Sequence, residues 1–129
     1  MRQNEPAAGA AGGQSTLPAA MEAFTRLADA WELSTDDQIK LLGSPGRSTF
    51  FKWKKEGGTL PRDTMERISY LLGIYKALQI LLPNPASADR WIKNPNEYFN
   101  NQSALDVMLG GQVVDIYKVR QYLDAQRGG

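Results

Sequence analysis

The stretch STDDQIKLLGSPGRSTFFKWKKE, residues 34–56, decides how the rest of the chain is interpreted. Ser34 is a favourable N-cap because its hydroxyl can accept a backbone N–H, and Gly43 can end the helix because glycine tolerates positive φ. A second helix can begin near Ser48, after a turn at residues 44–46. Two short helices joined by a tight turn are the outline of a helix-turn-helix.

The excess of basic over acidic residues in the chain is concentrated at the second helix. Residues 44–55 contain four basic and no acidic side chains, a charge of +4, whereas the whole chain carries +1. Such a face can contact DNA phosphates and base edges, although an ordinary solvated surface would show the same pattern. The candidate DNA-binding residues are Arg47, Ser48, Thr49, Lys52, Lys54 and Lys55.

The apolar side chains of this second helix are Phe50, Phe51 and Trp53. Phe50 and Trp53 lie three residues apart, which is the spacing of a buried helix face. We therefore expect these two rings to pack inward against Ile39 and Leu42 rather than stack on bases.

The composition excludes several classes of site. The chain of 129 residues has no Cys and no His, which rules out disulfides, Cys/His zinc sites, cysteine nucleophiles and Ser-His-Asp arrangements. Its most apolar stretch, residues 68–82, is 15 residues long and contains Lys76 and Gln79, so it is too short and too polar to span a membrane. The N-terminus lacks the apolar core of a signal peptide, and we expect a cytoplasmic protein.

The chain as a whole is predicted to be all-α, with one domain or two very small ones. Residues 1–16 are rich in Ala and Gly and should form a disordered tail. Residues 17–82 should form a DNA-binding-like domain, in which the helix-turn-helix lies between an amphipathic helix at 18–33 and a long helix at 61–82. Residues 86–129 should form a C-terminal domain with short helices near 88–92 and 103–109 and a last helix at 113–126. No segment shows the alternation of a strand.

The long helix predicted at 61–82 has an unusually wide apolar surface. It carries two stripes, one with Met65, Ile68, Leu72, Tyr75 and Leu82, the other with Leu71, Ile74, Leu78 and Leu81. An arc of that width buries against more than one neighbour. One side can close the helix-turn-helix core, and the other must meet the C-terminal part or a second copy of the chain. A homodimer would present two recognition helices to two DNA half-sites.

The C-terminal part carries a pattern of residues that resembles a known family. The pattern consists of Trp91, Asn94-Pro95-Asn96, Phe99, Ala104-Leu105-Asp106, Gly110-Gly111, Val119 and Leu123. With the preceding helix-turn-helix and long helix, it resembles the Xre/MbcA/ParS-type antitoxins from about residue 20 to the end. The family commonly has glycine and proline where this chain has Asn101 and Ala104. Asparagine is the best non-glycine residue for a left-handed backbone, so the loop geometry can persist.

This resemblance implies a function and a set of contact residues. In that family the C-terminal region binds and inhibits a RES-domain toxin, which consumes NAD or uses it for ADP-ribosylation, and the helix-turn-helix often binds the promoter of its own operon. Arg127 has five planar N–H donors, and terminal glycines let the backbone enter a narrow cleft, so the tail could block the toxin's active site. A frayed end is the alternative for the tail, and core packing is the alternative for Trp91. The candidate toxin-binding residues are Trp91, Asn96, Phe99, Arg120, Arg127, Gly128 and Gly129.

Two other function classes are alternatives to the antitoxin. A stand-alone dimeric helix-turn-helix regulator would bind operator DNA and have no toxin partner. An enzyme would need a general base, which is not evident at neutral pH without histidine. The carboxylate pairs Asp36/Asp37 and Asp63/Glu66 lie at predicted helix N-termini, where capping and the helix dipole explain them. We therefore expect a protein that is not an enzyme and needs no cofactor.

Overall fold

The structure, a computed structural model, describes residues 16–128. The tail predicted over residues 1–16 lies outside this range apart from Thr16, and Gly129 lies outside it as well. In chain order the elements are α1 (Thr16–Ala30), α2 (Thr35–Leu41), α3 (Arg47–Glu56), α4 (Arg62–Leu81), α5 (Pro85–Trp91), β1 (Pro95–Asn96), η1 (Glu97–Phe99), β2 (Gln102–Ser103), α6 (Ala104–Met108) and α7 (Val113–Gln126). The predicted all-α fold is confirmed.

The helix-turn-helix forms through the caps that its sequence supplies. The Ser34 hydroxyl accepts a hydrogen bond from the backbone N–H of Asp37 at 3.1 Å, at the start of α2. Gly43, at φ 99°, and Ser44, at φ 60°, form the turn that leads to α3. The Thr64 hydroxyl donates to the Leu42 carbonyl at 3.1 Å and fastens the turn to α4. The turn therefore has a fixed position on the long helix.

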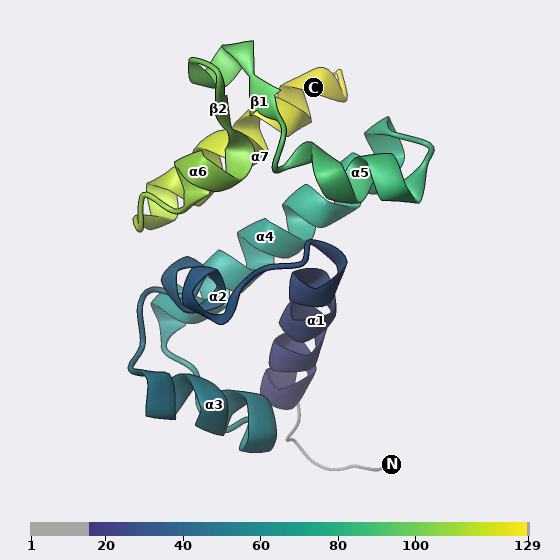
Figure 1. The fold of residues 1–129 in the computed structure, drawn as a ribbon. Coiled ribbons are helices and arrows are strands. Elements are labelled where there is room, and N and C mark those ends of the chain that lie inside the picture. The colour runs from purple at the N-terminus through teal and green to yellow at the C-terminus, as the bar shows by residue number, and fades with distance from the viewer. Residues whose placement is uncertain (1–15, 129) are drawn as a thin grey trace.

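Helix α4 is the axis of the molecule (Figure 1). In this view α1 and α3 lie below α4, whereas α6 and α7 lie above it and α5 follows its C-terminal end. Helix α7 runs alongside both halves of α4, since Tyr70 in the N-terminal half of α4 packs against Tyr117. Helix α4 packs against α1, α5 and most extensively α7. One of its two predicted neighbours is therefore the helix-turn-helix part, and the other is the C-terminal part of the same chain.

One hydrophobic core runs through both halves of the chain. Phe50 and Trp53 are buried, which confirms that these rings face inward. The largest fully buried side chains are Trp31, Phe24, Phe50, Leu41, Leu42, Leu71, Ile74, Leu78, Ile92, Met108, Ile116 and Leu123. They come from six of the helices and from the segments that adjoin them. Burying side chains of this kind stabilises a fold by roughly 1.5–3 kcal/mol each relative to exposure.

The C-terminal part differs from the prediction in two places. Helix α5 begins at Pro85 rather than near residue 88, because proline suits a first-turn position and the Asn84 side chain accepts from the Ser87 N–H at 3.1 Å. Strands were not predicted, yet β1 and β2 pair antiparallel, with Pro95 opposite Ser103. Two-residue strands are too short to show a sequence alternation.

The loop between these strands has the backbone that the family resemblance implied. Asn100 has φ 57° and Asn101 has φ 67°, so both are left-handed. The Asn101 N–H donates to the Asn96 carbonyl at 2.9 Å and closes the loop. Asparagine at position 101 therefore adopts the conformation for which glycine is the usual residue.

Candidate functional site

The first candidate surface is the outward side of α3. Burial of Phe50 and Trp53 fixes the rotation of this helix and turns the remaining side chains toward solvent. All six residues predicted to bind DNA are exposed on it, namely Arg47, Ser48, Thr49, Lys52, Lys54 and Lys55. The structure therefore brings the predicted set together on one helix.

The cations of this surface differ in what surrounds them. Arg47 Nη1 lies 2.7 Å from Asp36 Oδ1, and the guanidinium lies 5.9 Å from the Phe51 ring centroid. Lys54 Nζ lies 5.6 Å from the Phe50 ring centroid. Lys52 and Lys55 have no ion-pair partner among residues 16–128. These two ammonium groups are therefore the least engaged cations of α3.

Asp36 alters the charge of this surface in a way that was not predicted. Counting along the sequence placed no acidic residue near Arg47, but the fold brings the first turn of α2 against the start of α3. The two side chains are 62% and 82% exposed, so their ion pair contributes at most about 1 kcal/mol. An incoming phosphate can therefore compete with Asp36 for Arg47.

Phe51 also belongs to this surface, although it was not among the residues predicted to bind DNA. Its side chain is 46% exposed. Adjacent residues of an α-helix point about 100° apart, so Phe50 and Phe51 cannot both face the core once Trp53 does. That rotation was the signal that could have separated the two rings from sequence alone.

The second candidate surface surrounds an aromatic cluster in the C-terminal part. The Tyr122 ring of α7 lies 4.5 Å from Tyr98, 5.4 Å from Phe99 and 6.2 Å from Trp91, centroid to centroid. The Trp91 and Tyr122 planes differ by 13° and are stacked. Tyr98 is 67% exposed, whereas Phe99 is buried. Tyr98 and Tyr122 were not among the predicted contact residues, because only the fold brings them together.

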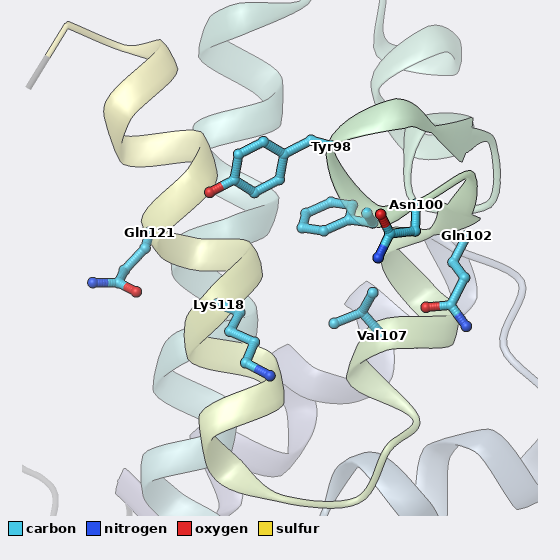
Figure 2. A pocket seen from close by; sticks show the side chains of 7 residues that line it. Tyr98, Asn100, Gln102, Val107, Lys118 and Gln121 are labelled. Atoms are coloured by element: carbon cyan, nitrogen blue, oxygen red, sulfur yellow. The ribbon is translucent and has the colours of Figure 1, made fainter.

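A pocket of about 340 Å³ opens beside this cluster (Figure 2). It is lined by Tyr98, Phe99, Asn100, Gln102, Val107, Lys118 and Gln121. Figure 2 shows Lys118 reaching from α7 toward α6, with Tyr98, Asn100 and Gln102 on the opposite wall. Lys118 Nζ also lies 3.7 Å from Asp115 Oδ1. Amide, ammonium and phenol groups around an apolar base can hold a polar side chain of another protein.

The residues predicted to bind a toxin have different structural roles. Asn96 Oδ1 accepts from the Tyr98 N–H at 2.8 Å and caps η1, and the buried Phe99 ring supports Tyr98. Trp91 is half-buried, which is intermediate between the toxin contact and the core packing that were its two alternatives. It lines a second hollow of about 220 Å³ together with Tyr122 and Gln126. Their contacts with a toxin stay predictions.

The other predicted residues lie on or beyond α7. Arg120 packs over Gly73 of α4, where an added Cβ would lie 2.6 Å from Arg120 Nη1, and its Nε lies 3.5 Å from Asp124 Oδ2. Its side chain is 34% exposed. Arg127 and Gly128 are exposed at the end of α7, while Gly129 lies outside the described residues. The predicted set therefore divides between the aromatic cluster, the contact with α4 and the tail.

Two further properties concern the part of the chain that the structure describes. None of its helices has both the length and the apolar character needed to cross a membrane. In residues 16–128, no cluster of three or more acidic side chains is suitably placed to hold a metal ion.

Comparison with known proteins gives matches over both halves of the chain. A family model described as the antitoxin Xre-like helix-turn-helix domain matches residues 14–73. A second, described as the antitoxin Xre/MbcA/ParS C-terminal toxin-binding domain, matches residues 77–129. The chain is also 69% identical over 113 residues to the uncharacterized protein y4oB of Sinorhizobium fredii, and the aligned region covers 88% of each protein.

Proposed function

The chain belongs to the Xre/MbcA/ParS family of antitoxins, and we propose that it neutralises a RES-domain toxin and represses its own operon. Residues 86–129 bind the toxin and block the site at which it consumes NAD. Residues 17–82 bind operator DNA, as a homodimer that places two copies of α3 on two half-sites. The role is regulatory rather than catalytic.

The exposed cations of α3 support the DNA-binding part of this proposal. Lys52 and Lys55 are exposed and have no ion-pair partner among the described residues, so DNA phosphates can replace their water without breaking an existing contact. Ser48 and Thr49 occupy the first turn, where hydroxyls and backbone N–H groups are available to phosphate oxygens.

The toxin-binding part is supported by the exposed groups of the C-terminal half. Tyr98 and the half-buried Trp91 form an aromatic surface around Tyr122, and aromatic side chains are enriched where interfaces gain most of their energy. Arg127 and Gly128 extend beyond α7, where a planar guanidinium and a flexible backbone can enter a concave site. A tail that occupies the NAD site excludes the substrate.

The observation that carries the proposal is the separation of the two surfaces along α4. Figure 1 shows α3 at one end of the molecule and the hairpin with the C-terminus at the other. A toxin on the aromatic cluster would therefore leave α3 free to reach DNA. One chain can thus hold its toxin and its operator at the same time.

Three of the four carboxylates in the pairs Asp36/Asp37 and Asp63/Glu66 have side-chain partners. Asp36 pairs with Arg47, Asp63 pairs with Arg67 at 2.7 Å, and Glu66 accepts the Tyr70 hydroxyl at 3.0 Å. Each contact ties a carboxylate to a neighbouring side chain. These contacts give the three carboxylates a structural role.

The test is to co-express the chain with the product of its neighbouring gene and to measure cellular NAD with and without the chain. We expect NAD to fall with the neighbouring protein alone, to be preserved by this chain, and the two proteins to co-purify. If no complex forms and NAD is unchanged, the stand-alone regulator becomes the better account. A titration of the purified chain with promoter DNA then tests whether the chain binds DNA specifically.

A further inference from the structure

Phe51 is an apolar side chain in the middle of a cationic surface. Within α3, all of whose residues are described, it is the one large apolar side chain that is exposed, at 46%. Arg47 and Lys55 lie one helical turn away on either side, and Lys52 adjoins it. A surface that meets only water or phosphate gains nothing from an aromatic ring at its centre.

The ring is held in place from below and from one side. The buried Phe50 ring lies 5.2 Å away at 68°, in an edge-to-face arrangement. The Arg47 guanidinium lies 5.9 Å from the Phe51 centroid and 2.7 Å from Asp36 Oδ1. A side chain that is already restricted in position loses less conformational entropy when it binds.

The chemistry of the major groove offers such a ring one matching group. The base edges there present hydrogen-bond donors and acceptors, and thymine adds the apolar C5-methyl group. From this match we propose that Phe51 contacts a thymine methyl group in the operator and so helps to determine its sequence. The inference rests on the proposed binding of operator DNA, and it concerns how bases are distinguished rather than whether DNA is bound.

Replacing thymine by uracil tests the contact, because uracil lacks only that methyl group. The fragment upstream of the chain's own gene is prepared once with thymine and once with uracil, and the full chain is titrated against each by fluorescence anisotropy at fixed salt. The unmodified chain should bind the thymine DNA about fourfold more tightly for each contacted methyl, since burial of one such group is worth roughly 0.8 kcal/mol.

Variants assign the preference to Phe51 rather than to the shape of the DNA. Phe51→Ala should bind both DNAs with one affinity, close to that of the unmodified chain for uracil DNA. Phe51→Gln should also bind both DNAs with one affinity. It keeps a long and helix-compatible side chain, so it replaces the alanine variant in the measurement if that variant folds poorly. Lys52→Ala should weaken binding to both DNAs equally and keep the ratio, because a phosphate contact does not sense the methyl group.

Three results would overturn the inference. Equal affinity of the unmodified chain for the two DNAs would show that no methyl group is contacted. A thymine preference that survives in both Phe51 variants would assign the contact to another residue. Failure of the unmodified chain to bind either DNA specifically would overturn the proposed DNA binding as well, which distinguishes it from the first two results.

Discussion

Arg67 of α4 donates a hydrogen bond from Nη2 to the carbonyl oxygen of Gly111 at 2.9 Å, although 44 residues separate them in the chain. Its Nε donates to Asp63 Oδ2 at 2.7 Å, and its side chain is only 7% exposed. A Cβ added to Gly43 would lie 3.3 Å from the same Nε. One buried guanidinium therefore touches the turn of the helix-turn-helix, the long helix and the loop before α7.

Arg67→Ala should lower the free energy of unfolding by about 2–3 kcal/mol, because it removes two hydrogen bonds of a charged group and leaves the Gly111 carbonyl without its donor. Arg67→Lys should recover only part of this loss, since an ammonium cannot reproduce the planar fork. The midpoint of urea unfolding measures both. Arg62→Ala, at an exposed position of the same helix, is the control and should leave the midpoint within about 0.5 kcal/mol. An unchanged midpoint for Arg67→Ala would show that the contact does not stabilise the fold.

Asn101→Ala should destabilise the chain by about 1 kcal/mol, because a left-handed backbone has a higher conformational free energy for alanine than for asparagine. Asn101→Gly should be neutral or stabilising, since φ 67° costs glycine no steric penalty. Thermal unfolding of the two variants gives the comparison. Gln102→Ala, at an exposed position outside the left-handed pair, should have little effect. A stable Asn101→Ala variant would mean that the loop changes its conformation.

The hydrogen bond from Tyr70 to Glu66 raises the pKa of the Tyr70 phenol, because the Glu66 carboxylate stabilises the protonated form. Glu66→Gln should therefore move the pKa of Tyr70 down, toward the usual value of about 10. The hydrogen bond stabilises the folded chain fully at pH values below the pKa of Tyr70 in the unfolded chain. This stabilisation is lost as the pH rises through the pKa of Tyr70 in the folded chain. NMR titration of tyrosine labelled at Cζ, with Tyr70→Phe for assignment, measures the shift. An ordinary pKa for Tyr70 in the unmodified chain would contradict the contact.

Replacing Lys52 and Lys55 together by alanine should weaken operator binding and reduce its salt dependence by about 0.9 in log–log slope for each lost phosphate contact. Toxin neutralisation should be unaffected, because these side chains lie on α3, at the end of the molecule opposite the C-terminus. The change in slope is read from titrations at several salt concentrations. Lys76→Ala with Arg90→Ala removes two exposed cations elsewhere and serves as the charge-matched control. Loss of operator binding and neutralisation together would contradict two separate surfaces.

Removal of residues 127–129 should weaken neutralisation of the toxin by at least about tenfold, because hydrogen bonds of a charged guanidinium contribute roughly 1.5–3 kcal/mol. Arg127→Lys should have an intermediate effect, since lysine keeps the charge without the fork. NAD consumption by the purified toxin at increasing concentrations of each variant measures the loss. Operator binding should stay at the level of the full chain. Complete inhibition by the shortened chain would show that the tail does not enter the active site.

Several features of the fold and of the candidate site were predictable from sequence because they depend on neighbours in the chain. The cap at Ser34 and the inward faces of Phe50 and Trp53 each follow from the chemistry of a few adjacent residues. The left-handed backbone at Asn101 was instead expected from the family resemblance, in which glycine is common at this position. The start of α5 was predicted near residue 88 and lies at Pro85, because proline is also a residue that opens helices.

The sequence by itself therefore determined which segments are helical, which faces they bury and where the basic residues of α3 lie, because helix periodicity and capping act within one or two turns. Only the tertiary structure decided that Asp36 meets Arg47, that Tyr98, Trp91 and Phe99 gather on Tyr122, and that Arg67 joins Gly111 to α4. These contacts depend on how whole helices cross, and that arrangement is settled by the packing of the complete core rather than by any local pattern.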